Sequence, residues 1–216
     1  MGDIMYKNRN LIANHIREHA AIYFFMLILF LIGIIFGAII VNSMNFIQRE
    51  DLFFYLDRFF GQMMDGTIAD SQEVFKSSIF YHLKYLLLLF LLGLSIIGLP
   101  VIWVMLFVKG LVVGFSVGFF VNQMGWKGLL FAAASIAPQN LLIIPAYLIA
   151  GSLAMIFSLT LLRKLFTRRS QQPILQPFAK YSMSFMTLLL FVAAASLVES
   201  FVSKPAMQVV IEWIYQ

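Results

Sequence analysis

An uncharged stretch of the chain contains polar and helix-breaking residues whose types could bind a ligand. Pro138, Gln139, Asn140 and Pro145 lie within the run Gly128–Leu162, which contains no charged side chain. Amides both donate and accept hydrogen bonds, whereas a proline removes a backbone donor and kinks a helix. The break could therefore form a substrate site, or it could be a kink that helps helices pack.

Other residue types offer little chemistry. His15 and His19 are spaced to share a helix face, but without a third ligand a wet interfacial helix explains them better than a metal site does. The chain has no cysteine, and it lacks a His-Glu-x-x-His motif, a Gly-rich phosphate loop and a Gly-x-Ser-x-Gly motif. We therefore predict no catalytic residue, no metal, no cofactor and no nucleic-acid partner.

The composition indicates a membrane protein. Hydrophobic residues make up 62% of the 216 residues and charged residues 12%, with a mean hydropathy of +0.91. Soluble domains are roughly 45–50% apolar and about 25% charged. Because backbone polar groups must be satisfied within lipid, the spans should be helices. The predicted fold class is all-α, a polytopic helical protein with one integral membrane domain over residues 1–216.

Five uncharged runs are long enough to cross a bilayer. They are Ala21–Val41, Tyr85–Val108, Gly110–Trp126, Gly128–Leu162 and Tyr181–Val198. On this division the ionisable residues His82, Lys109, Lys127 and Glu199 lie at span edges, and no span contains one. That absence argues against intramembrane catalysis and ion-coupled transport.

The distribution of charge predicts the orientation. Segments 1–20 and 163–180 are rich in Lys and Arg, whereas the connection 42–84 carries six acidic side chains. The positive-inside rule places both basic segments in the cytoplasm, which requires an even number of crossings between them. We expect four crossings before residue 163 and a fifth after it. Lys109 would then lie at the inner surface, Trp126–Lys127 at the outer interface, and 42–84 and the tail 199–216 outside.

The segment Gly128–Ala137 is left over on this count. It is too short to cross the membrane and too apolar for water. A half-helix in the outer leaflet and a tilted extension of the fourth span would both explain it.

Glycines predict one close helix contact. Gly110, Gly114 and Gly118 lie on one face of the third span, and Gly33 and Gly37 repeat the spacing in the first. Small residues at this spacing let two helix backbones approach. The contact could lie within the chain or between copies, so a homo-oligomer stays open.

The outer connection 42–84 predicts a helical hairpin. Asn45 with Gln48 indicates a capped helix start, and a second helix should begin near Asp70 or Ser71. One apolar face combines Leu52, Leu56, Phe59, Phe60 and Met63. This face would pack on the membrane domain or bind a partner. The candidate docking residues are Asp51, Leu52, Leu56, Asp57, Phe59 and Phe60.

Three segments resemble the stage II sporulation protein M family, in order and over nearly the whole chain. They are "FGAIIVNSMNFIQREDLFFYLDRFFGQ", "GLPVIWVMLFVKGLVVGFSVGFFVNQMG" and "PQNLLIIPAYLIAGSLAMIFSLTLLRKLF". The resemblance implies a multi-pass protein in the septal membrane between mother cell and forespore. It also implies a platform, not itself a hydrolase, that localises sporulation proteins D and P. These partners cut peptidoglycan during engulfment, D as a lytic transglycosylase and P as an amidase and endopeptidase.

The resemblance also bears on the break. Wider relatives tend to carry Pro-His-Gly, then Glu, then Pro-Ala at this place. Pro138, Pro145 and Ala146 match, but Gln139, Asn140 and Ile143 replace the His, Gly and Glu. Since the ionisable groups are missing while the prolines remain, we interpret the break as structural.

Two functions therefore compete. The first is a non-enzymatic scaffold that recruits wall hydrolases at the sporulation septum. The second is a permease-like subunit of a transporter, suggested by the broken helices and the glycine packing, both frequent in transporters. The lack of intramembrane charge and of a visible inverted repeat favours the scaffold.

Overall fold

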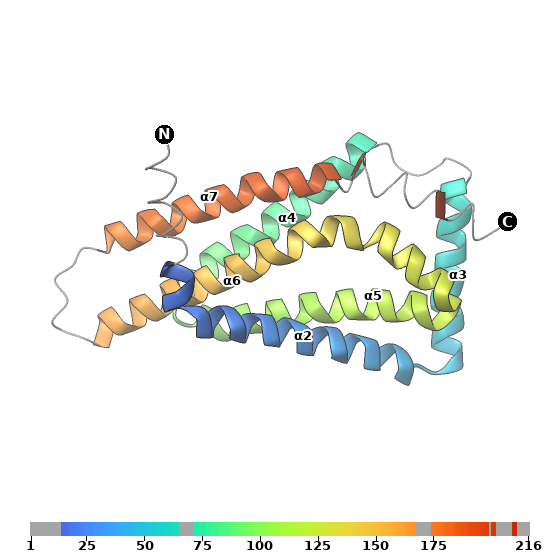
Figure 1. The fold of residues 1–216 in the computed structure, drawn as a ribbon, viewed down its shortest axis with the longest axis horizontal. Helices are drawn as coiled ribbons and strands as arrows, with labels where there is room; N and C mark the ends of the chain where they lie inside the picture. The colour runs from blue at the N-terminus through green and yellow to red at the C-terminus, as the bar shows by residue number, and fades with distance from the viewer. Residues whose placement is uncertain (1–13, 65–70, 167–173, 199, 202–208, 211–216) are drawn as a thin grey trace.

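The structure is a computed structural model that describes residues 14–64, 71–166, 174–198, 200–201 and 209–210. Within these residues every regular element is a helix, and five helices are long and apolar enough to cross a membrane. They are α2 (Ala20–Ser43), α4 (Ser71–Gly93), α5 (Gly98–Ser135), α6 (Ala137–Phe166) and α7 (Leu175–Val198). The predicted all-α polytopic fold is confirmed (Figure 1).

The central helix of the bundle is α6. It contacts each of the other four spanning helices, and it lies between the α4–α7 pair and the α2–α5 pair (Figure 1). Its buried face is built largely from small residues, namely Ala146, Ala150, Gly151, Ser152 and Ala154. Small side chains allow neighbouring helices to approach from several sides, which is how helices associate where lipid is as apolar as their own surface.

The most extensive helix contact joins α2 to α5, through interlocking glycines. A methyl group on Gly110 or Gly114 would overlap the backbone carbonyl oxygen of Phe30 or Ile34. Conversely, a methyl group on Gly33 or Gly37 would overlap a backbone carbonyl oxygen of α5. The predicted glycine face thus lies against α2 within the same chain. Gly118 is less tight, because its added methyl would meet Ala38 Cα at 3.3 Å.

The boundary between the second and third spans differs from the prediction. The chain turns at residues 94–97, and Ser158 Oγ donates a hydrogen bond to the Ser95 carbonyl across 3.0 Å. The second candidate span is Phe75–Gly93, and α5 starts at Gly98. The predicted spans Tyr85–Val108 and Gly110–Trp126 were wrong, because a charge at Lys109 was taken as the boundary. Pro100 marks the true helix start, since proline is tolerated in a first turn.

This shift also shortens the predicted connection 42–84. Its second helix begins at Ser71, as expected, but the apolar part of α4 starts at Phe75. The polar segment between the first two candidate spans is therefore 44–74.

Residues 126–135 form a half-helix that folds back on the end of α5. Gly125 adopts φ 56° and ψ −128°, a conformation that favours glycine, and the chain reverses there. The Phe120 and Phe131 rings meet across the reversal with centroids 4.8 Å apart. A turn at Ile136 then leads into α6. Of the two explanations for Gly128–Ala137, the structure agrees with the half-helix, and its place in the outer leaflet stays a prediction.

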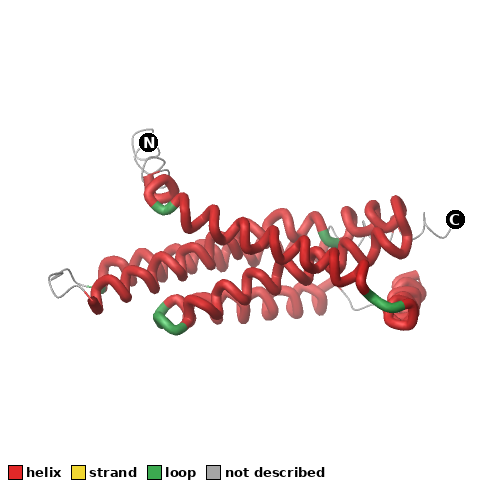
Figure 2. The backbone as a smooth tube through the Cα atoms, turned by 90° about the horizontal axis from the view of Figure 1, so that it is seen from below, coloured by secondary structure: helices red, strands yellow, loops and turns green. Residues whose placement is uncertain are grey.

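A sixth helix, α3 (Phe46–Met64), crosses one end of the bundle nearly at right angles to the spans (Figures 1 and 2). Arg49 holds this corner through three hydrogen bonds from its guanidinium group. It donates to the Met44 carbonyl at 3.1 Å, the Asn42 carbonyl at 2.8 Å and Asn122 Oδ1 at 3.2 Å. Because Asn122 belongs to α5, these bonds tie α3 to two spanning helices. A bilayer crossed by the five spanning helices would run roughly parallel to α3.

The start of α2 and the end of α6 lie at the same end of the bundle, opposite α3 (Figure 1). Four spanning helices separate the two basic segments, so the helix arrangement agrees with an even number of crossings. Which end faces the cytoplasm stays a prediction from charge.

We expect reporter domains that are active only outside the cytoplasm to be silent after Ser170. The same reporters should be active after Asp65 and after Gln216, because the charge rule places the basic segments inside. Activity after Ser170 would reverse or break the predicted topology.

We also expect the two glycines of α5 to tolerate alanine differently. Gly114→Ala places a methyl group against backbone and should destabilise the purified protein by about 1–3 kcal/mol, seen as a lower melting temperature. Gly118→Ala is the matched control, since it gains the same helix propensity while its methyl group meets Ala38 Cα at 3.3 Å, whereas that of Gly114→Ala would overlap the Ile34 carbonyl oxygen. Equal melting temperatures would contradict the packing argument.

Candidate functional site

A polar cavity of about 630 Å³ lies between α4, α5 and α6. Its wall contains Gln139 and Asn140, the two amides that interrupt the apolar run. The third substituted position, Ile143, is buried and lines the same cavity. The residues of the sequence break therefore form one wall of a cavity as well as a bend in the chain. From the sequence we had interpreted the break as a bend alone.

The most unusual wall residue is Lys109, in the middle of α5. Its Nζ lies 5.1 Å from the ring centroid of Tyr81, 5.2 Å from that of Tyr147 and 5.9 Å from that of Tyr85. All three distances fall within cation–π range. The prediction that Lys109 lies at the inner surface was wrong, because α5 continues through it from Gly98.

A buried histidine accompanies the lysine. His82 is 5% exposed, and its Nδ1 lies 2.5 Å from the Tyr147 hydroxyl. Tyr85 donates its hydroxyl to the Met105 carbonyl at 2.9 Å, which fixes the ring that stacks near Tyr147. His82 was predicted at a span edge, whereas it lies eleven residues inside α4. His82 and Lys109 thus lie within candidate membrane-spanning helices. The prediction that no span contains an ionisable residue was therefore wrong.

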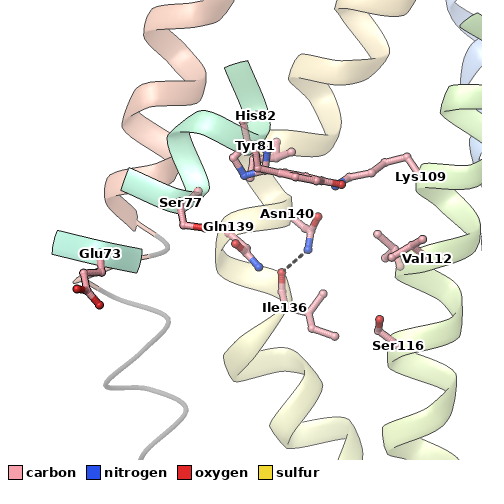
Figure 3. A pocket seen from close by; sticks show the side chains of 13 residues that line it. Glu73, Ser77, Tyr81, His82, Lys109, Val112, Ser116, Ile136, Gln139 and Asn140 are labelled. Carbon is pink, nitrogen blue, oxygen red and sulfur yellow. Dashed lines mark hydrogen bonds between the residues drawn. The ribbon is translucent and has the colours of Figure 1, made fainter. Parts of the chain in front are cut away.

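The turn at Ile136 shapes the α6 wall (Figure 3). Asn140 donates to the Ile136 carbonyl twice, from its backbone nitrogen at 3.2 Å and from Nδ2 at 2.8 Å. The side-chain amide thereby compensates for the loosened backbone at the bend. Pro138 is the second residue of α6, where its missing donor costs nothing. Pro145 lies within α6 on an exposed face, one turn beyond the cavity.

The sequence contained signals for this cluster that the span division missed. Tyr85 follows His82 by three residues and Tyr81 by four, spacings at which side chains on one helix are neighbours. Two long uncharged runs flank Lys109. Of its two direct neighbours, only Gly110 is a residue type common in turns. A lone lysine in such a context fits the interior of one helix better than a boundary between two.

The candidate docking residues on α3 divide between two faces. Leu52 and Leu56 are half-buried, and Leu52 lines a second cavity of about 570 Å³ with Ile39 and Phe115 of the bundle. Asp51 and Asp57 are exposed. The side chains of Phe59, Phe60 and Met63 lie outside the described part of the structure. At least the Leu52 part of the apolar stripe thus faces the protein's own membrane domain.

The outward surface of α3 is nevertheless apolar. Its exposed residues include Phe46, Ile47, Phe53, Phe54 and Tyr55, with the last two 64% and 68% exposed. Aromatic side chains beside acidic ones suit either the interfacial layer of a membrane or a protein partner.

The histidine pair near the chain start behaves as an interfacial feature. The His15 and His19 rings are tilted by 35° to each other with centroids 4.7 Å apart, and burial, with a smaller contribution from His19, lowers the pKa of His15. Among the described residues, no third ligand-type side chain joins them.

Comparison with known proteins identifies the family. A family model described as stage II sporulation protein M matches residues 26–204. No curated protein and no solved structure matched the chain. The matched range includes all five candidate spans apart from the first turns of α2, together with α3 and the residues of the polar cavity. The chain therefore belongs to the stage II sporulation protein M family, as a multi-pass membrane protein of sporulation.

Proposed function

We propose that this protein is a non-enzymatic membrane scaffold of the engulfment machinery. It would recruit peptidoglycan hydrolases, sporulation proteins D and P, and hold them at the septal membrane between mother cell and forespore. The observation that carries the proposal is the family match over residues 26–204. A scaffold also needs a partner surface outside the bundle, and α3 supplies a candidate.

The orientation of α3 supports a docking role. If the charge rule is correct, α3 lies on the outer face of the membrane, where wall hydrolases act. Arg49 ties the start of α3 to α5, so the exposed aromatic residues are presented at a defined height above the spans. Buried aromatics with a polar rim are typical of contact hot spots. The exposed Asp51 and Asp57 would form part of such a rim.

A second candidate, a permease-like transporter subunit, is favoured by one specific observation. The polar cavity brings Lys109 and His82 inside the bundle, as transport sites do. Co-purification separates the two functions, because a scaffold should retain wall hydrolases and a transporter subunit should retain an ATPase.

We expect Phe54→Ala with Tyr55→Ala to reduce the amount of hydrolase that co-purifies with the membrane-inserted protein by about tenfold, equivalent to ~1.4 kcal/mol. The matched control is Phe24→Ala with Phe36→Ala, which removes exposed aromatics from the lipid-facing surface of α2. Hydrolase captured per inserted protein is the measurement. Equal capture by both double variants would exclude this surface as the docking site.

The exposed carboxylates of Asp51 and Asp57 lead to a separate prediction. Asp51→Lys with Asp57→Lys should weaken capture at low salt and much less at high salt, because surface charges are screened within roughly 10 Å at 0.1 M. Capture that does not depend on salt would show that these carboxylates take no part.

A further inference from the structure

We propose that the groove between the end of α2, the start of α3 and α5 binds a phospholipid whose headgroup carries a primary ammonium, as phosphatidylethanolamine does. This groove is the second cavity, of about 570 Å³, which Leu52 lines together with residues of the bundle. The inference goes beyond the scaffold role and does not depend on it. It rests on the apolar wall of the groove, its depth in the bilayer and the polar groups at its rim.

The wall of the groove is apolar and open to lipid. Ile39 and Ile40 of α2 are 53% and 41% exposed. Phe115 of α5 and Leu52 of α3 are half-buried and line the same groove. Because α3 crosses the end of the bundle while α2 runs along it, the two helices enclose a corner (Figures 1 and 2). Lipid tails are as apolar as these side chains, so an acyl chain fits against this wall.

The groove lies where the hydrocarbon core of a bilayer meets the headgroups. Helix α2 has 24 residues, which at ~1.5 Å per residue make about 36 Å, whereas the hydrocarbon core is about 30 Å thick. The last two residues of α2, Asn42 and Ser43, are polar, so Ile39 and Ile40 occupy the last apolar turn of the span. The groove therefore has an apolar wall at the depth of acyl chains and a polar rim at the depth of headgroups.

The rim carries a carboxylate together with neutral acceptors and donors. Asp51 is the one charged residue among the described lining residues, and it is exposed. Ser43 Oγ donates to the Ile39 carbonyl at 2.9 Å, so its lone pairs serve as acceptors. Gln48 Oε1 accepts from the Asn45 backbone nitrogen at 3.1 Å, which leaves its amide nitrogen as a donor. A primary ammonium would donate to the carboxylate and the hydroxyl, and the lipid phosphate would accept from the amide.

These groups discriminate between headgroups. Phosphatidylcholine has the same net charge as phosphatidylethanolamine, but its quaternary ammonium has no N–H to donate to Asp51. Phosphatidylglycerol has a negative charge and no cation, so the Asp51 carboxylate repels it. The Arg49 guanidinium donates to the carbonyl of the lining residue Met44 at 3.1 Å, which places a positive charge beside the groove for the phosphate. A headgroup with both charges and N–H donors therefore matches the site.

The full chain in nanodiscs tests the proposal by lipid-dependent melting, with no hydrolase present. Phosphatidylcholine in the discs is replaced stepwise by phosphatidylethanolamine in one arm and by phosphatidylglycerol in the other. A lipid at about ten times its apparent Kd raises the melting temperature of a chain of this size by roughly 3–6 °C. We expect a rise of this order for the wild type with phosphatidylethanolamine. Failure of this test would leave the scaffold role standing, because hydrolase capture is a separate measurement.

Two single variants assign the rise to the groove. Asp51→Asn keeps the shape of the side chain and removes its charge, so it should reduce the rise to less than about half. Glu50→Gln is the matched control and should keep the full rise, since Glu50 is exposed and is not among the lining residues. No rise in the wild type, an equal rise in Asp51→Asn or an equal loss in Glu50→Gln would overturn the proposal. A rise with phosphatidylglycerol that Asp51→Asn abolishes would overturn it too, because that lipid has no ammonium.

Discussion

Close backbone packing between α2 and α5 is the interaction on which the rest of the structure depends. Within lipid, burying an apolar side chain gains little, so helices associate through contact between backbones. Gly33, Gly37, Gly110 and Gly114 allow that contact from both helices at once. With α5 fixed against α2, the positions of Lys109 and Ser116 on its other faces are set. The kink of α5 at Gly125 is then fixed as well, and with it the start of the half-helix.

The polar cavity shows how this bundle tolerates a lysine in an apolar setting. A charged side chain near the centre of a span costs roughly 2.5–3.5 kcal/mol, and each cation–π contact returns about 0.5–2 kcal/mol. Three tyrosine rings around Lys109 thus offset much of that cost. The rings are themselves held, Tyr85 by the Met105 carbonyl and Tyr147 by its contact with His82. These contacts explain how the bundle accommodates the lysine.

The sequence predicted the class, the number of spans and the family, because each depends on long apolar runs or on extended similarity. It misplaced the boundary after the second span, because the run from Tyr85 to Val108 contains no charge and the turn at 94–97 is marked only by Ser95, nearby glycines and Pro100. The cavity was missed for a different reason: Tyr81, His82 and Lys109 are distant in sequence from Gln139. Only the helix arrangement brings them together, and periodicity within one helix carries no information about which neighbour it meets.

The reversal at Gly125 has a consequence for the surrounding lipid. At the α3 end, the described residues add a crosswise helix and a folded-back half-helix to the bundle (Figure 1). At the opposite end they add the turn at 94–97 and the short helix 14–18. The described residues thus place their crosswise helices mainly at the α3 end. Where such helices lie in one leaflet, they expand it, and a bilayer that bends to expand that leaflet accommodates them with least stress, so we expect the protein to sort by membrane curvature. Its partition between vesicles of small and large diameter would measure that preference.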